Sequence, residues 1–366
     1  MDFSLTEEQI LLRDSVARFC RDQVDVAQWR RLNTGEAELP EEGWRQIAAM
    51  GWLGLAVPES LGGLGGGPVE VMLLAEGLGR GLVAQPVIET AVLSARLLAQ
   101  CSRREELALL MEGGLRLALA AVETGQRFAL QRVETRARRA GAGWVVEGAK
   151  SFVPAGNSAH AFILTTMTEA GFSLFLLPAA AAGLQRADYV TADGRRASTL
   201  RLDGVALPES ALLGTEGQGW PLLEEAVDRT IAALCAEAVG AMEVLHETTV
   251  EYLKQRRQFG RALADFQALQ HRLADMYVAC EEARSLLLLA TLRLEDAPRE
   301  RVRAVSAAKA RIGQNARFIA HQAIQLHGAM GMCEEVAVAH YAKRLLAIDA
   351  LFGGADFHKR RFAAAA

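Results

Sequence analysis

The sequence has few cysteines, and none is placed to bind a metal. Five cysteines lie far apart in 366 residues, with no C-x-x-C pair and no histidine at metal-ligand spacing. We therefore expect no metal site. We interpret the five as reduced core thiols: Cys20, Cys101, Cys235, Cys280 and Cys333.

Long apolar runs and a strong net charge are also missing. No run approaches 18 uncharged apolar residues, and the N-terminal "MDFSLTEEQ" is acidic, unlike the basic start of a signal peptide. Lys and Arg (40) nearly balance Asp and Glu (44), for a net charge of -4, which gives no electrostatic reason to expect a nucleic-acid or membrane partner. We therefore expect a soluble, cytoplasmic protein with neither kind of partner.

Length and local pattern predict several domains. A chain of 366 residues exceeds the size at which single cores usually stop growing, so we expect two or three domains. Residues 4–110 are predicted to be helical, beginning with Ser4 and Glu7 at capping-box spacing. The glycine-rich "VPESLGGLGGG" joins two helical stretches and follows no strand, so we interpret it as a turn and not as a phosphate-binding loop.

The middle of the chain has the pattern of a β domain. Short runs rich in Val, Phe, Leu and Thr, such as "GWVVEGAKSFV" and "AFILTT", alternate with Gly, Pro and Ala turns. The chain then becomes helical again, with amphipathic segments at 222–254, 265–297 and 300–328. The sequence thus predicts an α+β multidomain protein with an N-terminal α-helical domain (1–114), a middle β domain (115–213) and a C-terminal helical domain (214–366).

One apolar helical segment carries an unexpected pair of charges, Asp228 and Arg229. Glu237 is the only other charged residue between positions 227 and 242. A solvated pair in the first turn of a helix is the simplest interpretation, because a carboxylate there suits the positive end of the helix dipole. The apolar residues around the pair recur at the helical period: Val227, Ile231, Leu234, Ala238, Met242 and Leu245.

Several motifs together resemble the acyl-CoA dehydrogenase family over essentially the whole chain. "YLKQRRQFGRALADFQALQ" matches the family's R-x-Q-F-G followed by F-Q, and "QLHGAMG" matches its Q-x-x-G-G-x-G. "MDFSLTEEQ", "GWLGLAVPESLGGLG" and "LDGVALPESALLGTEGQGW" are similar to its opening, its early glycine-rich loop and its exit from the β domain. The resemblance implies N-terminal helices, a middle β-barrel or sandwich domain and a C-terminal four-helix bundle.

The resemblance also implies FAD as the cofactor. Arg256 offers a planar guanidinium for the pyrophosphate, Phe259 an aromatic surface for the adenine, and Gly328 a close backbone approach. In the family these segments act on the flavin of a neighbouring subunit, which implies a homodimer or homotetramer. The cofactor-binding set from these segments is Arg256, Phe259, Gln267, Gln325, Gly328, Ala329 and Gly331.

The β domain departs from the family pattern at the flavin ring. Where relatives carry T-E-P-x-x-G-S-D, this chain has "AVETGQRF" and keeps only Glu123. "KSFVPAG" places Phe152 at the position of the family's Trp and Pro154 at that of its Thr, and proline offers neither an N–H nor a hydroxyl. Glu123 and Phe152 are predicted cofactor contacts, and the alternative is a strand that only packs on the core.

The family's reaction needs a carboxylate base, which takes the α-proton of a CoA thioester while a hydride leaves the β-carbon for flavin N5. The Glu that serves in many relatives falls on Phe352 here, and Gly354 replaces a neighbouring Thr. Other relatives place the base just before an Arg that follows the β domain, which here gives Asp228 as base and Arg229 as its charged neighbour. Burial would raise the pKa of this carboxyl and the guanidinium would lower it. Asp is also shorter than Glu by about 1.3 Å, and such misplacement can cost roughly 10²-fold in rate.

The first hypothesis is an FAD-dependent acyl-CoA dehydrogenase that desaturates a CoA thioester between its α and β carbons and passes electrons to an electron-transfer flavoprotein. A second is a non-catalytic or half-site subunit of a heterotetramer, because the chain keeps the segments that act on a neighbour's flavin and loses those that hold its own. A third is a flavin oxidase that uses O₂ and shares every motif. A flavin-bearing protein purified alone would weigh against the second.

Overall fold

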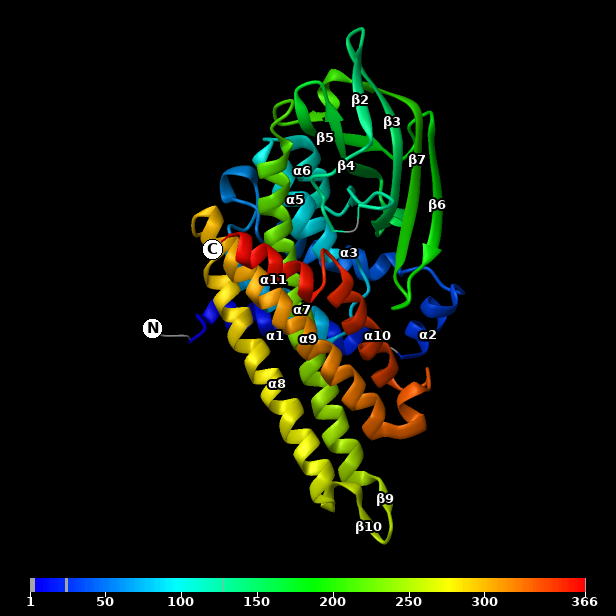
Figure 1. The fold of residues 1–366 in the computed structure, drawn as a ribbon, viewed down its shortest axis with the longest axis vertical. Helices are drawn as coiled ribbons and strands as arrows, with labels where there is room; N and C mark the ends of the chain where they lie inside the picture. Colours follow the sequence, from blue (N-terminus) through cyan, green and yellow to red (C-terminus); the bar gives the residue numbers. More distant parts are fainter. Residues whose placement is uncertain (1–3, 24–25, 127, 366) are drawn as a thin grey trace.

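The computed structural model describes residues 4–23, 26–126 and 128–365, and it has the expected order of helices, sheet and helices. Residues 1–3 of "MDFSLTEEQ" and residue 127 of "AVETGQRF" lie outside the described residues. Figure 1 shows the sheet at one end of the molecule and the long C-terminal helices extending away from it. The predicted division after residues 114 and 213 stays a prediction.

The N-terminal region is helical, as expected. The capping box predicted at Ser4 and Glu7 lies instead at Thr6 and Gln9, which exchange hydrogen bonds of 3.2 and 3.0 Å between side chain and backbone at the start of the first helix. A Cβ at Gly63 would lie 2.2 Å from the carbonyl oxygen of Val57, so the glycine-rich stretch is a tightly packed turn. The helices are α1 (Glu7–Gln23), α2 (Val26–Thr34), α3 (Glu41–Ala49), α4 (Pro68–Arg80), a π-helix (Ile88–Ser94), α5 (Ala95–Gln100) and α6 (Arg104–Met111).

The middle region is one sheet, in the order β6-β7-β3-β2-β4-β5-β8, with β1 paired in parallel to β4. Among the described residues the end strands β6 and β8 do not pair, so the barrel form of the prediction is wrong, although the β domain itself is confirmed. Trp144, Phe162 and Phe175 share one core enclosed by the sheet. The strands are β1 (Leu117–Ala120), β2 (Arg136–Ala140), β3 (Gly143–Pro154), β4 (Ala161–Thr168), β5 (Gly171–Pro178), β6 (Leu184–Val190), β7 (Arg196–Pro208) and β8 (Leu212–Leu213).

The C-terminal region is a helical bundle whose three longest helices confirm the predicted amphipathic segments. A short hairpin, β9 (Arg257–Gln258) and β10 (Arg261–Ala262), joins the first two at the end farthest from the sheet (Figure 1). The helices are α7 (Gly219–Gln255), α8 (Gln267–Leu292), α9 (Pro298–His327), α10 (Ala337–Ala350) and α11 (Ala355–Ala364).

Helices α4 and α7 approach each other closely through glycine. A Cβ at Gly240 would lie 2.1 Å from the carbonyl oxygen of Glu76, and one at Gly79 would lie 2.0 Å from that of Glu237. Only glycine allows backbones to come so near. The contact fixes α7 against the N-terminal helices, with Glu237 at the crossing.

Three of the cysteines are core thiols, as predicted. Cys20, Cys235 and Cys280 are buried and free, and burial raises the pKa of each thiol to about 12. Cys101 and Cys333 are only half-buried, so for these two the core assignment is wrong. Nowhere in the described ranges does a helix have the length and apolar character needed to cross a membrane.

Candidate functional site

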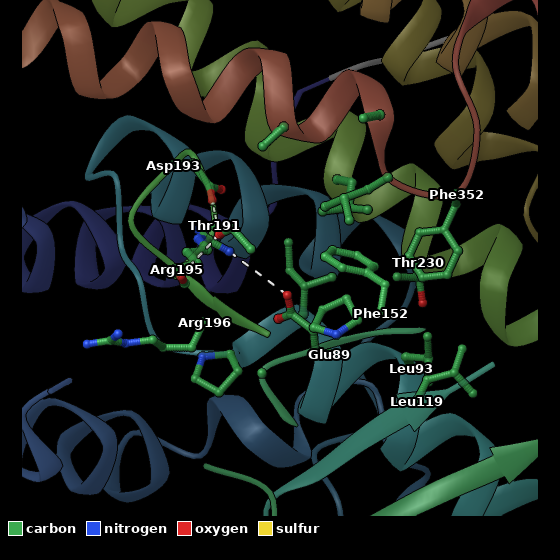
Figure 2. A pocket seen from close by; sticks show the side chains of 18 of the residues that line it. Glu89, Leu93, Leu119, Phe152, Thr191, Asp193, Arg195, Arg196, Thr230 and Phe352 are labelled. Atoms are coloured by element: carbon green, nitrogen blue, oxygen red, sulfur yellow. Dashed lines mark hydrogen bonds and ion pairs between the residues drawn. The ribbon is translucent and has the colours of Figure 1, made fainter. Parts of the chain in front are cut away.

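A cavity of about 420 Å³ lies where the sheet meets the two helical regions. Its walls come from the π-helix, strands β1 and β3, the segment before β7, helix α7, and the end of α10 with the loop that follows. In the view of Figure 2, Thr230 and Phe352 lie on one side, Asp193 and Arg195 on the other, and Glu89 between them. The cavity therefore joins all three regions of the chain.

Most of the cavity wall is apolar, and two phenylalanines from distant segments contribute to it. Phe152 lies on β3, where a bridge to Val122 fixes the strand, and Phe352 lies on the loop after α10. The remaining apolar lining includes Leu39, Leu93, Leu119, Leu130 and Leu234. Such a wall binds apolar groups and excludes water.

The loop that carries Phe352 is held by one buried lysine. The Lys309 ammonium donates hydrogen bonds to the carbonyl oxygens of Ile348, Asp349 and Gly353 at 2.8, 2.9 and 3.1 Å. Burial lowers the pKa of Lys309 despite the favourable field of nearby acidic groups. The three acceptors lie on both sides of Phe352, so this ammonium fixes the position of its ring.

The polar side of the cavity is a network of charges. Arg344 binds Asp193 through Nη1 at 2.9 Å and Glu237 through Nη2 at 2.7 Å, and Arg195 donates to Glu237 at 2.7 Å. Burial opposes ionisation of both carboxyls, but the two guanidinium groups outweigh it and lower the pKa values of Asp193 and Glu237. The network therefore stays charged and holds the segment before β7 against α7 and α10.

Glu89 differs from the other acidic residues of the cavity. Its Oε1 lies 4.0 Å from Nη1 of Arg195, which is too long for a hydrogen bond. Its Oε2 is buried and has no hydrogen-bond partner among the residues that the structure describes. Glu89 thus lines a largely apolar cavity with a carboxylate that accepts no hydrogen bond from the described residues.

Asp228 is buried but does not belong to the cavity lining. It receives hydrogen bonds from Arg361 Nη1 at 2.6 Å and from Arg301 Nε at 3.0 Å, so the solvated-pair interpretation is wrong. On the same helix the cavity is lined by Thr230 and Leu234. Two residues of α-helix correspond to a rotation of about 200°, so Asp228 faces away from Thr230, toward α9 and α11.

Arg229 also lies outside the cavity. Its guanidinium pairs with Glu225, one turn earlier on α7, and with Glu295 at 3.0 Å. It lines a second, smaller cavity beside α4 and α5. The adjacent residues Asp228 and Arg229 therefore face different parts of the molecule and do not bind each other.

Sequence comparisons assign all three regions of the chain. Residues 6–105, 118–205 and 217–366 match the N-terminal, middle and C-terminal domains of acyl-CoA dehydrogenase. The chain belongs to the acyl-CoA dehydrogenase family. The fold prediction from the resemblance is confirmed, apart from the barrel.

Relatives of this acyl-CoA dehydrogenase family member resemble it along its whole length. Acryloyl-CoA reductase (NADH) of Anaerotignum propionicum is 26% identical over 98% of this chain and 94% of its own. The solved Tcur3481-Tcur3483 steroid ACAD variant is 30% identical, with a TM-score of 0.88 over 98% of this chain and 97% of its own. PigA, solved in complex with FAD, is 26% identical, with a TM-score of 0.92 over 100% of this chain and 98% of its own.

The residues predicted to hold FAD divide into two places. Phe152 lines the cavity, whereas Arg256, Phe259 and Gln267 lie exposed at the hairpin end of α7 and α8 (Figure 1). Phe259 is 86% exposed at the hairpin tip, with a left-handed backbone at φ 53°. Residues so exposed are accessible to a molecule outside this chain, and their contact with a cofactor stays a prediction.

The turn after α9 provides the second part of the exposed set. Gln325, Gly328 and Ala329 are exposed, and a Cβ at Gly328 would meet nothing within 4 Å of this chain. The Tyr252 ring stacks on His327 at 4.3 Å and so joins this turn to the end of α7. The open backbone at Gly328 fits a bound dinucleotide. Gly331 is buried, and a Cβ there would lie 2.7 Å from the carbonyl oxygen of Ile324, so Gly331 serves packing.

Glu123 is bound to the protein. Its carboxylate accepts hydrogen bonds from Lys150 Nζ and Thr135 Oγ1, both at 2.6 Å, and from the backbone N–H of Glu134 at 2.6 Å. Burial disfavours its ionised form, but Lys150 outweighs burial and lowers the pKa of Glu123. Its contact with a cofactor stays a prediction, while the geometry shows a structural carboxylate between β1 and β3.

The sequence analysis missed the polar residues of the cavity. Glu89 is the only charged residue in the apolar run "QPVIETAVL", and Glu237, which binds the lining residues Arg195 and Arg344, is the only charge between positions 230 and 242 of α7, so the sequence indicated both. Their partners Arg195 and Arg344 lie far along the chain, and no local pattern connects them. No motif or unusual charge in the sequence indicated Thr230 as a cavity residue.

Proposed function

We propose that this chain is an FAD-dependent acyl-CoA dehydrogenase that desaturates a CoA thioester between its α and β carbons. The observation that carries the proposal is the apolar cavity between Phe152 and Phe352, in a chain whose three domains match this family. An acyl chain is the part of an acyl-CoA that such a wall favours. FAD, when bound, supplies the two-electron acceptor that the reaction needs.

The chain's own residues prepare the site for this chemistry. Phe152 offers a flat aromatic surface to a flavin ring, and Asn157 and Ser158 add polar side chains to the lining. The apolar wall excludes water, which strengthens electrostatic interactions inside the cavity. The residues present therefore fit FAD, with fewer hydrogen-bond donors to the ring than in relatives because Pro154 replaces Thr.

Asp228, the predicted base, does not line the cavity. A general base must reach the proton it takes, and Asp228 is bound by Arg301 and Arg361 on the side of α7 away from the cavity. The geometry favours a structural role for Asp228, and its role as base, with Arg229 as neighbour, stays a prediction. Phe352 lines the cavity at the alternative position but cannot accept a proton.

We also propose that the protein is a homodimer or homotetramer and that it passes electrons to an electron-transfer flavoprotein. Large apolar side chains are exposed on α8, at the hairpin and after α9, namely Tyr277, Val278, Phe259 and Met332. Such exposure in a stable protein favours burial by another subunit. Light scattering that shows an FAD-loaded monomer would contradict the assembly. A cytoplasmic location stays a prediction.

Anaerobic titration of the purified, FAD-loaded protein with a panel of acyl-CoAs tests the function. We expect at least one acyl-CoA to bleach the flavin absorbance, with free CoA as the control that does not. Reoxidation by O₂ as fast as by electron-transfer flavoprotein would favour an oxidase. If no acyl-CoA bleaches the flavin, the result would favour the alternative that the chain is a non-catalytic subunit. Bleaching by NADH, followed by reoxidation with an enoyl-CoA, would indicate the reductive direction named for the Anaerotignum propionicum relative.

A further inference from the structure

The carboxylate of Glu89 is unusual because it is nearly buried in a cavity and yet incompletely bound. Its side chain is 17% exposed, its Oε2 has no partner in the described part of the chain, and its Oε1 is 4.0 Å from the nearest guanidinium nitrogen of Arg195. A buried acceptor without a donor is costly. The carboxylate therefore keeps acceptor capacity that the described residues do not use, and a ligand that brings a donor to it would use that capacity.

The charges around Glu89 are also unbalanced. Glu89, Asp193 and Glu237 are three carboxylates, and the guanidinium groups facing them are Arg195 and Arg344. Arg195 donates through Nη2 to Glu237 and to a backbone carbonyl, and its Nη1 lies 4.0 Å from Glu89 without a hydrogen bond. Arg196, also in the lining, lies 3.8 Å from Glu38 and leaves the balance unchanged. The cavity can therefore accept one positive charge or one strong hydrogen-bond donor.

The backbone that carries Glu89 is fixed. Glu89 lies in the π-helix Ile88–Ser94, and the Ser94 hydroxyl donates to the Glu89 carbonyl oxygen at 2.8 Å. Widened π-turns are frequent at functional sites because they displace a side chain from the regular helical position. The π-helix and the Ser94 hydrogen bond thus fix the backbone that places the Glu89 carboxylate at the cavity.

We propose that the cavity recognises an acyl group bearing a hydrogen-bond donor, either a hydroxyl or a protonated amine, which donates to the Glu89 carboxylate. This inference rests on the proposed binding of an acyl-CoA. It adds a substrate class that the apolar wall alone does not specify. The apolar residues bind the methylene groups and Glu89 binds the polar group that they carry.

The test uses matched acyl-CoAs that differ only in the donor. Plain, ω-hydroxy and ω-amino acyl-CoAs of about four to eight carbons are titrated into the FAD-loaded protein, and affinity is measured by calorimetry. At one chain length or more, we expect the donor-bearing ligand to bind about 10- to 100-fold more tightly than the plain chain, as for a hydrogen bond to a charged group. Glu89→Gln should abolish this preference, so that the donor-bearing and plain chains bind with equal affinity.

Two further variants complete the experiment. Glu105→Gln, on the exposed first turn of α6, makes the same chemical change outside the cavity and should alter no affinity. Glu89→Asp keeps the charge but withdraws it by one methylene, so it should weaken the preference, and it provides a second folded variant if Glu89→Gln unfolds. In Glu89→Gln, the ω-amino acyl-CoA should lose more affinity than the ω-hydroxy acyl-CoA, because it loses a charge attraction as well as a hydrogen bond.

Equal affinities at every length, or a preference that survives in Glu89→Gln, would overturn the inference. A fall in flavin reduction by plain acyl-CoAs at unchanged affinity would also overturn it, because Glu89 would then act at the reacting carbon. Failure of the proposed function looks different. In that case the ligands bind with the expected preference, yet none bleaches the flavin.

Discussion

The buried Asp228 and the half-buried Arg361 lie 133 residues apart and form an ion pair, with Nη1 of the arginine 2.6 Å from Oδ1 of the carboxylate. Arg301 binds the other oxygen, Oδ2, at 3.0 Å. The carboxylate belongs to α7 and the two arginines to α11 and α9. One side chain therefore connects three helices of the C-terminal region.

Asp228→Asn should lower the free energy of unfolding by about 3–5 kcal/mol. The amide removes the negative charge and leaves the buried Arg301 without this counter-charge, while Arg361 keeps only Glu224 at 3.3 Å, which is the costly way to break such a pair. Urea unfolding measures the change. Combined with Arg361→Met, the two effects should be non-additive by about 0.5–3 kcal/mol, as for residues in contact.

The catalytic role of Asp228 gives a different result in the same variant. If Asp228 is also the base, flavin reduction in the folded variant would fall by roughly 10² to 10⁴ in addition to the loss of stability. Asp228→Glu separates the two roles again. A longer carboxylate crowds the two arginines and should lower the free energy of unfolding, whereas a catalytic base of the length that relatives use should keep or raise the rate of flavin reduction. Asp14→Asn, at an exposed ion pair, is the control and should change stability by no more than about 0.5 kcal/mol.

Phe352→Glu should increase flavin reduction by about 10²-fold or more. The substitution places a carboxylate in the cavity at the family's usual position for the base, and general-base catalysis contributes on this order. Stopped-flow absorbance with the best acyl-CoA measures the rate. Phe352→Gln is the control, because glutamine has the shape of glutamate but cannot act as a base. A similar gain in rate in Phe352→Gln would show that the carboxylate at position 352 is not the cause. A loss of rate in Phe352→Glu would show that the base lies elsewhere.

Arg256→Ala should lower the flavin content of the purified protein and leave its fold intact. Arg256 is exposed, so its removal deletes a phosphate contact and no part of the core. The ratio of flavin absorbance to protein absorbance measures occupancy. Arg257→Ala is the matched control, because Arg257 is the adjacent exposed arginine and falls at the variable position of R-x-Q-F-G. Equal occupancy in both variants would remove the assignment of Arg256.

The Lys150–Glu123 pair should make stability depend on alkaline pH. Burial lowers the pKa of Lys150 from 10.5 to about 8, although Glu123 opposes the shift. Between these values the unfolded chain binds more protons than the folded one, so the free energy of unfolding from this group rises with pH, by about 3 kcal/mol in total. Unfolding of the wild type and of Glu123→Gln/Lys150→Met across pH 8 to 10.5 isolates the effect, and parallel profiles would contradict it.

The elements that the sequence predicted are those with a pattern of their own. Helices α7, α8 and α9 repeat apolar residues at the helical period, and β3, β4, β5 and β7 are rich in apolar strand formers. Strands β2, "RARRA", and β6, "LQRADYV", were missed because their side chains are mostly exposed. Their strand conformation depends on pairing with β3 and β7, which a local pattern does not contain.

The site was predictable only where a motif gave a position. Phe152 and Phe352 follow from such positions, and both line the cavity. The side of α7 that carries Asp228 did not follow, because it is set by packing against α9 and α11, whose arginines lie 73 and 133 residues away. A charge in an apolar helix indicates a buried partner, but the sequence does not identify that partner.

The π-helix of residues 88–94 makes the length of this segment matter. A π-turn contains one residue more than an α-turn between its hydrogen-bonded groups. Deleting one residue here would let the segment close as regular α-helix while α5 and the rest of the chain kept their places. The Glu89 side chain would then lie at a different angle around the helix and no longer line the cavity. Loss of a single codon in this segment, with no substitution, would therefore change a cavity lining that accepts a polar acyl group into one that accepts only hydrocarbon chains.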